Sequence, residues 1–398
     1  MTTKPLKTIY LDYASTTPID SGVLEKMYEY DKVYFANPSA LYAGGAMSKK
    51  RLEEERARAA RALQVRAPEL FFTSGGTESD NLALRGTVTA FKKKYPERTP
   101  HIVVSAIEHA AILDTANDLK NSGVLVSTVP VSKDGLVRPL DVIELITPDT
   151  VIVSVMSVNN EIGTVQPVGN IGKLIREYRE KNNTDYPLLH TDACQAGNYE
   201  LVTAPRYKCD LLTINASKVY GPKGVGLLYV KSGVDIDPIL FGGGQEKRLR
   251  SGTESVSLVI GLVESFIMAQ NMREVETERL SVIQKETIKK IKERFPKFII
   301  NGSLSDRVPN NINITVGGLS AEELVIRLDA VGVSVSSKSA CSSMDTDGSY
   351  VIMAIGGSEQ AARETLRITM GRDTEQTDLD YLLDEIESIL QKYDNTNL

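Results

Sequence analysis

The chain has 398 residues, 41% of them hydrophobic, and a formal net charge of −6 from 46 basic and 52 acidic side chains. This length predicts about two domains with sizeable cores. The sequence contains neither an apolar run of the ~18 residues that cross a bilayer nor a long basic cluster, which argues against a membrane protein and against direct nucleic-acid binding.

Short apolar runs alternate with amphipathic stretches through the first two thirds of the chain, a pattern typical of a mainly parallel sheet covered by helices. The predicted strands are residues 69–73, 101–105, 124–130, 151–155, 188–191, 211–215 and 226–230. Their carboxyl ends carry the polar motifs, and open α/β sheets usually bind ligands at that edge.

The first motif is Thr-Ser-Gly-Gly-Thr-Glu-Ser at residues 73–79, ahead of a helix expected to run through residues 81–89. Gly76 and Thr77 open this helix, where unpaired amides and the helix dipole favour a phosphate. An ordinary helix cap is the alternative and is favoured when the motif is considered alone. In combination with Asp192 and Lys218, the phosphate interpretation is favoured instead.

Asp192 and Lys218 each follow a predicted strand. A lysine that forms a Schiff base and an aspartate that keeps a pyridine nitrogen protonated are the groups that pyridoxal phosphate chemistry needs. Taken singly, Lys218 could be a surface lysine and Asp192 a turn residue. The same holds for His109, which could simply begin a helix or could stack on the cofactor ring.

A long charged helix around residues 264–294 is expected to lead into a second, α+β domain that ends with a helix at residues 378–393. We therefore predict a large cofactor-binding domain at residues 15–262 and a small domain formed by residues 1–14 and 263–398. The N-terminus lacks the apolar core of a secretory signal, so we expect a cytoplasmic protein.

The three cysteines, Cys194, Cys209 and Cys341, form no CxxC pair, and the three histidines are scattered, so neither a disulfide framework nor a metal site is expected. Cys209 has the setting of a small buried side chain. Cys341 lies in residues 336–350, where six of fifteen residues are serine. We expect a mobile loop that carries a reactive thiol.

The order of motifs makes the chain resemble a cysteine desulfurase of the class V aminotransferase superfamily, in the branch that serves iron-sulfur cluster assembly and tRNA thiolation. The resemblance covers nearly the whole chain and implies the fold of type I pyridoxal-phosphate-dependent transferases. The segments that carry it are residues 10–13, 73–79, 158–163, 190–195, 217–224, 250–253, 339–341 and 366–367.

The resemblance implies roles for individual residues. Lys218 would hold pyridoxal 5'-phosphate, Asp192 would face the pyridine nitrogen and His109 would stack on the ring. The other implied cofactor contacts are Gln195 at the phenolic oxygen and Gly76, Thr77, Asn215 and Ser217 at the phosphate. Asn160 and Arg367 would hold the substrate carboxylate. Asn160 would also contact the cofactor. Thr253 would reach the phosphate of the neighbouring subunit in a homodimer.

The implied reaction removes sulfur from L-cysteine, leaving L-alanine and a persulfide on Cys341. An acceptor, either an iron-sulfur scaffold protein or a thiolation enzyme, would then take the sulfur. Catalysis would rest on Lys218, Cys341 and His109, and Lys338 could promote the thiolate. A selenocysteine lyase, a class V aminotransferase and a non-enzymatic scaffold or sensor stay open as alternatives.

The chain departs from the family pattern in three places. Ser217 stands where relatives usually have histidine, Asn215 where they usually have serine, and Gln245 where close relatives tend to have histidine. Ser217 and Asn215 can still donate hydrogen bonds to a phosphate. The tail after the last predicted helix is short, whereas relatives that supply the iron-sulfur scaffold often extend further.

Overall fold

The computed structural model describes residues 8–337 and 348–396. Its largest sheet has seven strands in the order β2-β8-β7-β6-β5-β3-β4. The neighbours β3–β4, β3–β5, β5–β6 and β6–β7 are parallel, while β8 runs antiparallel to both β2 and β7. The strands are β2 (Leu70–Thr73), β3 (His101–Ser105), β4 (Leu125–Val129), β5 (Thr150–Ser154), β6 (Leu188–Asp192), β7 (Leu211–Asn215) and β8 (Gly226–Val230). The predicted α/β class is confirmed.

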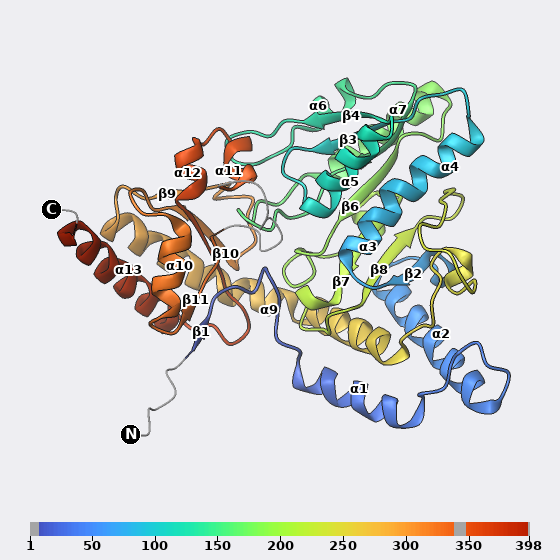
Figure 1. The fold of residues 1–398 in the computed structure, drawn as a ribbon, viewed down its shortest axis with the longest axis horizontal. Helices are drawn as coiled ribbons and strands as arrows, with labels where there is room; N and C mark the ends of the chain where they lie inside the picture. Colours follow the sequence, from blue (N-terminus) through green and yellow to red (C-terminus); the bar gives the residue numbers. More distant parts are fainter. Residues whose placement is uncertain (1–7, 338–347, 397–398) are drawn as a thin grey trace.

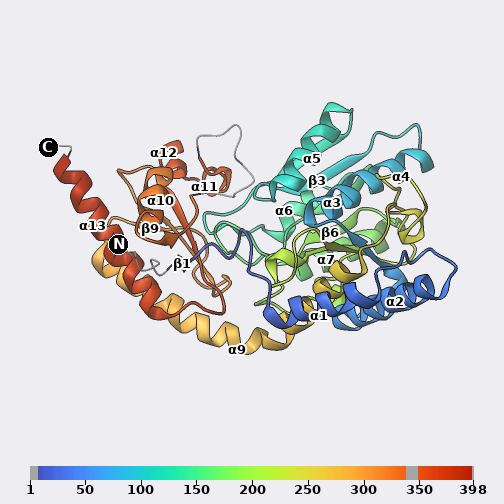
Figure 2. The ribbon, with the colours of Figure 1, turned by 60° about the horizontal axis from the view of Figure 1, so that its bottom comes forward.

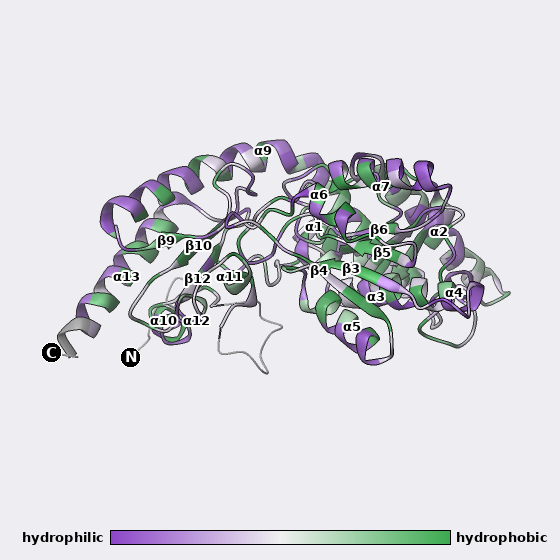
Figure 3. Cartoon of the chain, turned by 90° about the horizontal axis from the view of Figure 1, so that it is seen from above, coloured by the Kyte–Doolittle hydropathy of each residue, from purple (hydrophilic) through white to green (hydrophobic). Residues whose placement is uncertain are grey.

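The central strands are apolar on both faces because helices cover both faces. In β3, Ile102 packs in one hydrophobic cluster with Leu82 and Ile112, whereas its neighbour Val103 packs in another with Ile171 and Ile260. Figure 3 shows the hydrophobic strands enclosed by more hydrophilic helices. The helical elements of this part are α1 (Ser21–Val33), α2 (Ala43–Leu63), η1 (Ala67–Glu69), α3 (Gly76–Asn81), η2 (Leu82–Gly86), α4 (Thr87–Lys94), α5 (Ala110–Asn121), α6 (Pro139–Glu144), α7 (Val168–Asn182), α8 (Ala204–Tyr207), η3 (Ala216–Lys218) and η4 (Glu246–Arg248).

Helix α9 (Val256–Arg294) runs from the large sheet to the smaller sheets (Figure 1). It begins eight residues before the start predicted at residue 264. Its first turns, from Val256 to Val263, are buried nearly all round, so they lack the amphipathic period by which a surface helix is recognised. From Leu280 onward only one stripe is buried, as on an ordinary surface helix.

The C-terminal third forms a three-stranded antiparallel sheet, β12-β10-β9, and β1 pairs in parallel with β11. Figure 2 shows α13 and part of α9 along one side of these strands. The elements are β1 (Ile9–Tyr10), β9 (Ile299–Ile300), β10 (Asn311–Thr315), α10 (Ala321–Asp329), β11 (Val333–Ser334), α11 (Tyr350–Ala354), α12 (Glu359–Arg363), β12 (Thr365–Thr369) and α13 (Gln376–Thr396).

The pairing of β1 with β11 attaches the N-terminal strand to the C-terminal third. This pairing supports the proposed division into a large domain (residues 15–262) and a small domain (residues 1–14 and 263–398). The proposed domain boundary at residue 263 falls inside the continuous helix α9. Within the described part of the chain, no helix combines the length and the apolar character that a bilayer span requires.

Candidate active site

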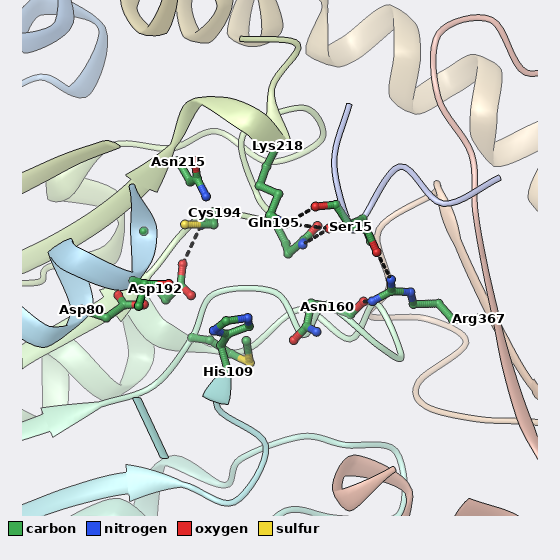
Figure 4. A pocket seen from close by; sticks show the side chains of 14 residues that line it. Ser15, Asp80, His109, Asn160, Asp192, Cys194, Gln195, Asn215, Lys218 and Arg367 are labelled. Atoms are coloured by element: carbon green, nitrogen blue, oxygen red, sulfur yellow. Dashed lines mark hydrogen bonds between the residues drawn. The ribbon is translucent and has the colours of Figure 1, made fainter. Parts of the chain in front are cut away.

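A cavity with a volume of about 120 Å³ opens where the parallel strands of the large sheet end. Asp192 is the last residue of β6 and Asn215 the last residue of β7, so two neighbouring strands deliver polar side chains to the same place. Figure 4 shows these side chains converging from several elements. The cavity is lined by Ala14, Ser15, Gly76, Thr77, Asp80, His109, Met156, Asn160, Asp192, Cys194, Gln195, Asn215, Lys218 and Arg367.

Lys218 reaches the cavity from η3, the short turn after β7. Its Nζ atom donates hydrogen bonds to the carbonyl oxygens of Ala14 at 3.0 Å and Ser15 at 2.5 Å. The Nδ2 atom of Asn198 donates to the Lys218 carbonyl at 2.7 Å and fixes the backbone. The amine therefore stands on the same cavity as Asp192, as the sequence predicts.

Asp192 is held rigidly at the floor of the cavity. It is 7% exposed, and its Oδ1 atom accepts a hydrogen bond from the backbone amide of Cys194 at 2.8 Å. A carboxylate fixed by a backbone donor cannot rotate freely, so it presents its charge in one direction.

The predicted phosphate turn lies at the start of α3, where Gly76 and Thr77 face the cavity. A β-carbon on Gly226 of β8 would lie 2.6 Å from the backbone of Gly75, so only glycine there lets the turn approach the sheet this closely. A side chain on Gly76 would meet Cys194 Sγ at 3.1 Å and project toward Asn215. The first amides of the helix thus remain open to an anion.

Asn215 and Ser217 form a local unit. The Asn215 Oδ1 atom accepts hydrogen bonds from the Ser217 amide at 3.3 Å and from the Ser217 hydroxyl at 3.2 Å. Asn215 lines the cavity, whereas Ser217 is buried behind it and does not. Because both donors occupy the carbonyl end of the Asn215 amide, its Nδ2 end remains available to the cavity.

His109 and Gln195 both line the cavity, as expected. His109 is the N-cap of α5, and its Nδ1 atom accepts a hydrogen bond from the Ala111 amide at 3.1 Å. This bond fixes the imidazole ring. The Nε2 atom of Gln195 donates at 2.9 Å to the Ala14 carbonyl oxygen, which also accepts from Lys218 Nζ.

Arg367 enters from β12, in the C-terminal sheet, and is 1% exposed. Its Nη1 atom donates to the Asn160 carbonyl at 3.0 Å, and its Nη2 atom donates to Asp12 at 2.8 Å and to the Ser15 hydroxyl at 2.7 Å. Among the described residues, Arg367 Nε and Asn160 Oδ1 have no hydrogen-bond partner. Two buried polar atoms on one cavity are thus left for a ligand.

The sequence did not point to Ala14, Ser15, Asp80, Met156 or Cys194 as cavity residues. Asp80 lies one helical turn beyond Thr77, so the helical period could have indicated it. Cys194 follows Asp192 by two residues. Ala14 and Ser15 reach the cavity only through the long-range pairing of the N-terminal segment, which has no local sequence signature.

Other predicted site residues lie elsewhere. Thr253 is exposed and does not line this cavity, which leaves its expected contact with a neighbouring subunit untested. Cys341 and Lys338 lie outside the described residues. Cys194 and Cys209 are buried free thiols, and burial raises the pKa of both. Among the residues that the structure describes, no group of three His, Cys, Asp or Glu side chains is placed to hold a metal ion.

Comparison with known sequences finds full-length similarity. The family model described as "Aminotransferase class-V" matches residues 9–382. The chain is 38% identical to a cysteine desulfurase IscS of Dictyoglomus turgidum, over 96% of this chain and 95% of that protein. It is 39% identical to a cysteine desulfurase IscS of Clostridium botulinum strain Kyoto, over 97% and 95%.

The similarity to solved structures also extends over nearly the whole chain. A structure described as a NifS-like protein superposes with a TM-score of 0.88 at 30% identity, covering 96% of this chain and 99% of that one. A structure of SspA in complex with cysteine superposes with a TM-score of 0.77 at 33% identity, covering 91% and 99%. The superposed parts therefore include both the large sheet and the C-terminal sheet.

Proposed function

The chain belongs to the class V aminotransferase family, and we infer that it is a cysteine desulfurase, an enzyme that uses pyridoxal 5'-phosphate to remove sulfur from L-cysteine. The full-length match to cysteine desulfurases carries this conclusion. The roles of individual residues, the persulfide on Cys341, the homodimer, the sulfur acceptor and a cytoplasmic location are our proposal.

The cavity supports the cofactor assignment. An amine at Lys218 suits an aldehyde, the carboxylate of Asp192 suits a protonated pyridine nitrogen, and the open helix start at Gly76 and Thr77 suits a phosphate. Asn215 would add an amide donor at the phosphate, and Ser217 would act by orienting it. When bound, the cofactor supplies an aldehyde that takes up amino groups and a ring that accepts electrons.

The other end of the cavity supports binding of an amino-acid carboxylate. Arg367 offers a planar guanidinium group with a free Nε donor, and the side chain of Asn160 lines the same cavity. We propose that Arg367 and Asn160 orient the substrate so that its α-carbon faces Lys218. His109 would cover the cofactor ring, and Gln195 would bind its phenolic oxygen.

Different residues carry out the proton transfers and the sulfur transfer. The Lys218 Nζ atom removes the α-proton and returns a proton to carbon, while Asp192 keeps the ring nitrogen protonated. The Cys341 thiolate attacks the substrate sulfur, so that the carbon–sulfur bond breaks and a sulfur–sulfur bond forms. The electron pair of the broken bond stays with carbon, which takes up a proton, and the products are alanine and a persulfide.

Exposed apolar side chains on two neighbouring segments, residues 33–47 and the segment around Phe241, support the homodimer proposal. Large exposed apolar patches usually mark protein–protein interfaces. Pro38 and Ser39 line one surface groove together with residues 243–247, so the two segments are neighbours. Gly252 donates to Gln245 at 2.9 Å, which places Thr253 beside them. The exposed apolar residues are Val33, Phe35, Leu41, Tyr42, Met47 and Phe241.

The deciding experiment is incubation of the cofactor-loaded protein with L-cysteine, followed by intact mass and amino-acid analysis. We expect a gain of one sulfur atom on Cys341 and formation of alanine. Lys218→Ala should abolish formation of both alanine and the persulfide. Cys341→Ala should still bind cofactor and substrate but should form little alanine or persulfide. Cys209→Ala is the matched control and should keep both, because Cys209 lies away from the cavity. Formation of a keto acid in place of alanine would contradict the assignment.

A further inference from the structure

Two further carboxyl groups are buried around Asp192. Asp80 projects from α3 and lines the same cavity (Figure 4). Glu108 precedes His109 in the segment after β3. Asp80 is 1% exposed and Glu108 is fully buried. Three negative charges in so small a buried volume would repel one another strongly.

Within the described part of the chain, no lysine or arginine forms an ion pair with Asp80, Glu108 or Asp192. The imidazole of His190 lies beside Asp80, with its Nε2 atom 3.6 Å from Asp80 Oδ1. The two ring nitrogens of His190 hydrogen-bond to the hydroxyls of Ser154 at 2.9 Å and Thr213 at 3.0 Å. Burial lowers the pKa of His190 to about 4, despite the opposing effect of Asp192, so the ring is neutral.

The hydrogen bonds around the three acids differ. Asp80 Oδ1 and Glu108 Oε2 are buried without a partner among the described residues. Glu108 Oε1 accepts from the Ser105 hydroxyl at 2.5 Å and from the Met156 amide at 2.7 Å, so the unpaired Oε2 contrasts with a fully bonded Oε1. An unpaired buried oxygen costs far less when its carboxyl group is neutral than when it is charged.

The electrostatics agree with this geometry. Burial, with a smaller contribution from the charge of Asp192, raises the pKa of Glu108 from 4.5 to about 8 against the opposing hydrogen bonds from Ser105 and Met156. Burial and the charge of Asp192 also raise the pKa of Asp80 well above its ordinary value, with Thr213 opposing and Glu108 adding to the effect.

We propose that Asp80 and Glu108 are held as neutral, protonated acids, and that the negative charge at the floor of the cavity is thereby confined to Asp192. This role rests on the proposed function, in which Asp192 faces the ring nitrogen. Asp80 and Glu108 are positioning residues that act through Asp192. A single charge at that point matches one protonated nitrogen, whereas three charges would repel the phosphate and the substrate carboxylate.

Infrared difference spectroscopy of the cofactor-free protein near neutral pH tests this assignment. A protonated carboxyl group and a carboxylate have separate stretching bands. Asp80→Asn and Glu108→Gln should each remove a protonated-acid band, and Asp192→Asn should remove a carboxylate band. Loss of a carboxylate band in Asp80→Asn or Glu108→Gln would overturn the proposal.

A second measurement does not depend on the folding of these variants. In wild-type protein, selective carbon-13 labelling of aspartate and, separately, of glutamate carboxyl groups should shift protonated-acid bands in both samples. Absence of a shifted acid band in either sample would contradict the proposal. Because both measurements use cofactor-free protein, their outcome is independent of whether the loaded enzyme releases sulfur from L-cysteine.

Discussion

The guanidinium group of Arg367 donates a hydrogen bond of 2.8 Å to the carboxylate of Asp12, 355 positions away in the chain. This ion pair joins β12 to the segment that follows β1, and the Arg367 side chain is 2% exposed. The pair, together with Ser15 and the Asn160 carbonyl, fixes the plane of the guanidinium group at the substrate end of the cavity.

Arg367→Lys should therefore weaken substrate binding although it keeps the positive charge. A lysine cannot reproduce the planar set of donors, and the loss of a charged hydrogen bond, about 1.5–3 kcal/mol, corresponds to roughly a 10–150-fold rise in KM for L-cysteine. Steady-state rates of alanine formation at varied L-cysteine concentration measure this KM. Arg363→Lys, at an exposed position of α12, is the control and should leave KM within about twofold. An unchanged KM in Arg367→Lys would remove this residue from substrate binding.

The Ser217–Asn215 unit predicts unequal effects on cofactor affinity. Asn215→Ala removes a donor from the cavity and should raise the dissociation constant about 10-fold or more, whereas Ser217→Ala removes one orienting bond and should raise it about 2–10-fold, from about 0.5–1.5 kcal/mol. Absorbance titration of the cofactor-free protein measures both constants. A larger effect from Ser217→Ala would mean that the serine hydroxyl itself contacts the phosphate.

Ser349 should stabilise the protein more than an ordinary cap. Its hydroxyl accepts from the Ile352 amide at the start of α11 and donates to Glu161 Oε2 at 2.5 Å, next to Asn160. Ser349→Ala should therefore cost about 2–4 kcal/mol, the sum of a cap and a buried bond to a carboxylate. Ser358→Ala, which removes only the exposed cap of α12, should cost about 1 kcal/mol. Thermal unfolding midpoints compare the two, and equal losses would show that the bond to Glu161 adds nothing.

Glu69 should contribute to acid sensitivity. Burial tends to raise its pKa, but hydrogen bonds from Ser232 and Arg66 prevail and lower the pKa from its ordinary value of 4.5 to about 2. Its ionised form therefore stabilises the folded state above about pH 4.5, and this contribution is lost as the pH falls toward 2. Glu69→Gln should flatten the fall of unfolding midpoint with decreasing pH across that window. Glu97→Gln, at an exposed position, should keep the wild-type slope.

Cys194 and Cys209 should resist alkylation in the folded protein. Burial raises the pKa of both thiols, and the charge of Asp192 adds to the effect at Cys194, so neither provides a thiolate near neutral pH. Peptide mass spectrometry after brief treatment with iodoacetamide measures the modification. Denatured protein is the control and should be labelled at both positions. Rapid labelling of Cys194 in the native protein would show that its environment is more open than the structure indicates.

Much of the fold follows from local sequence. The runs at residues 101–105, 211–215 and 226–230 coincide with β3, β7 and β8, because a strand covered on both faces is a short continuous apolar segment bounded by polar residues. The start of α9 was missed by eight residues for the related reason that a fully buried helix has no polar face.

The sequence by itself determined the α/β class and the strand-end placement of Asp192 and Lys218, because these depend on apolar runs and on residues adjacent to them. Only the tertiary structure decided that Ala14 and Ser15 reach the cavity, that Ser217 stands behind Asn215, and that Asp80 and Glu108 lie near Asp192. Those relationships arise when β1, β6 and β12 are brought together by folding, and hydrogen bonds and electrostatic coupling depend on distances of a few ångströms that no spacing along the chain encodes.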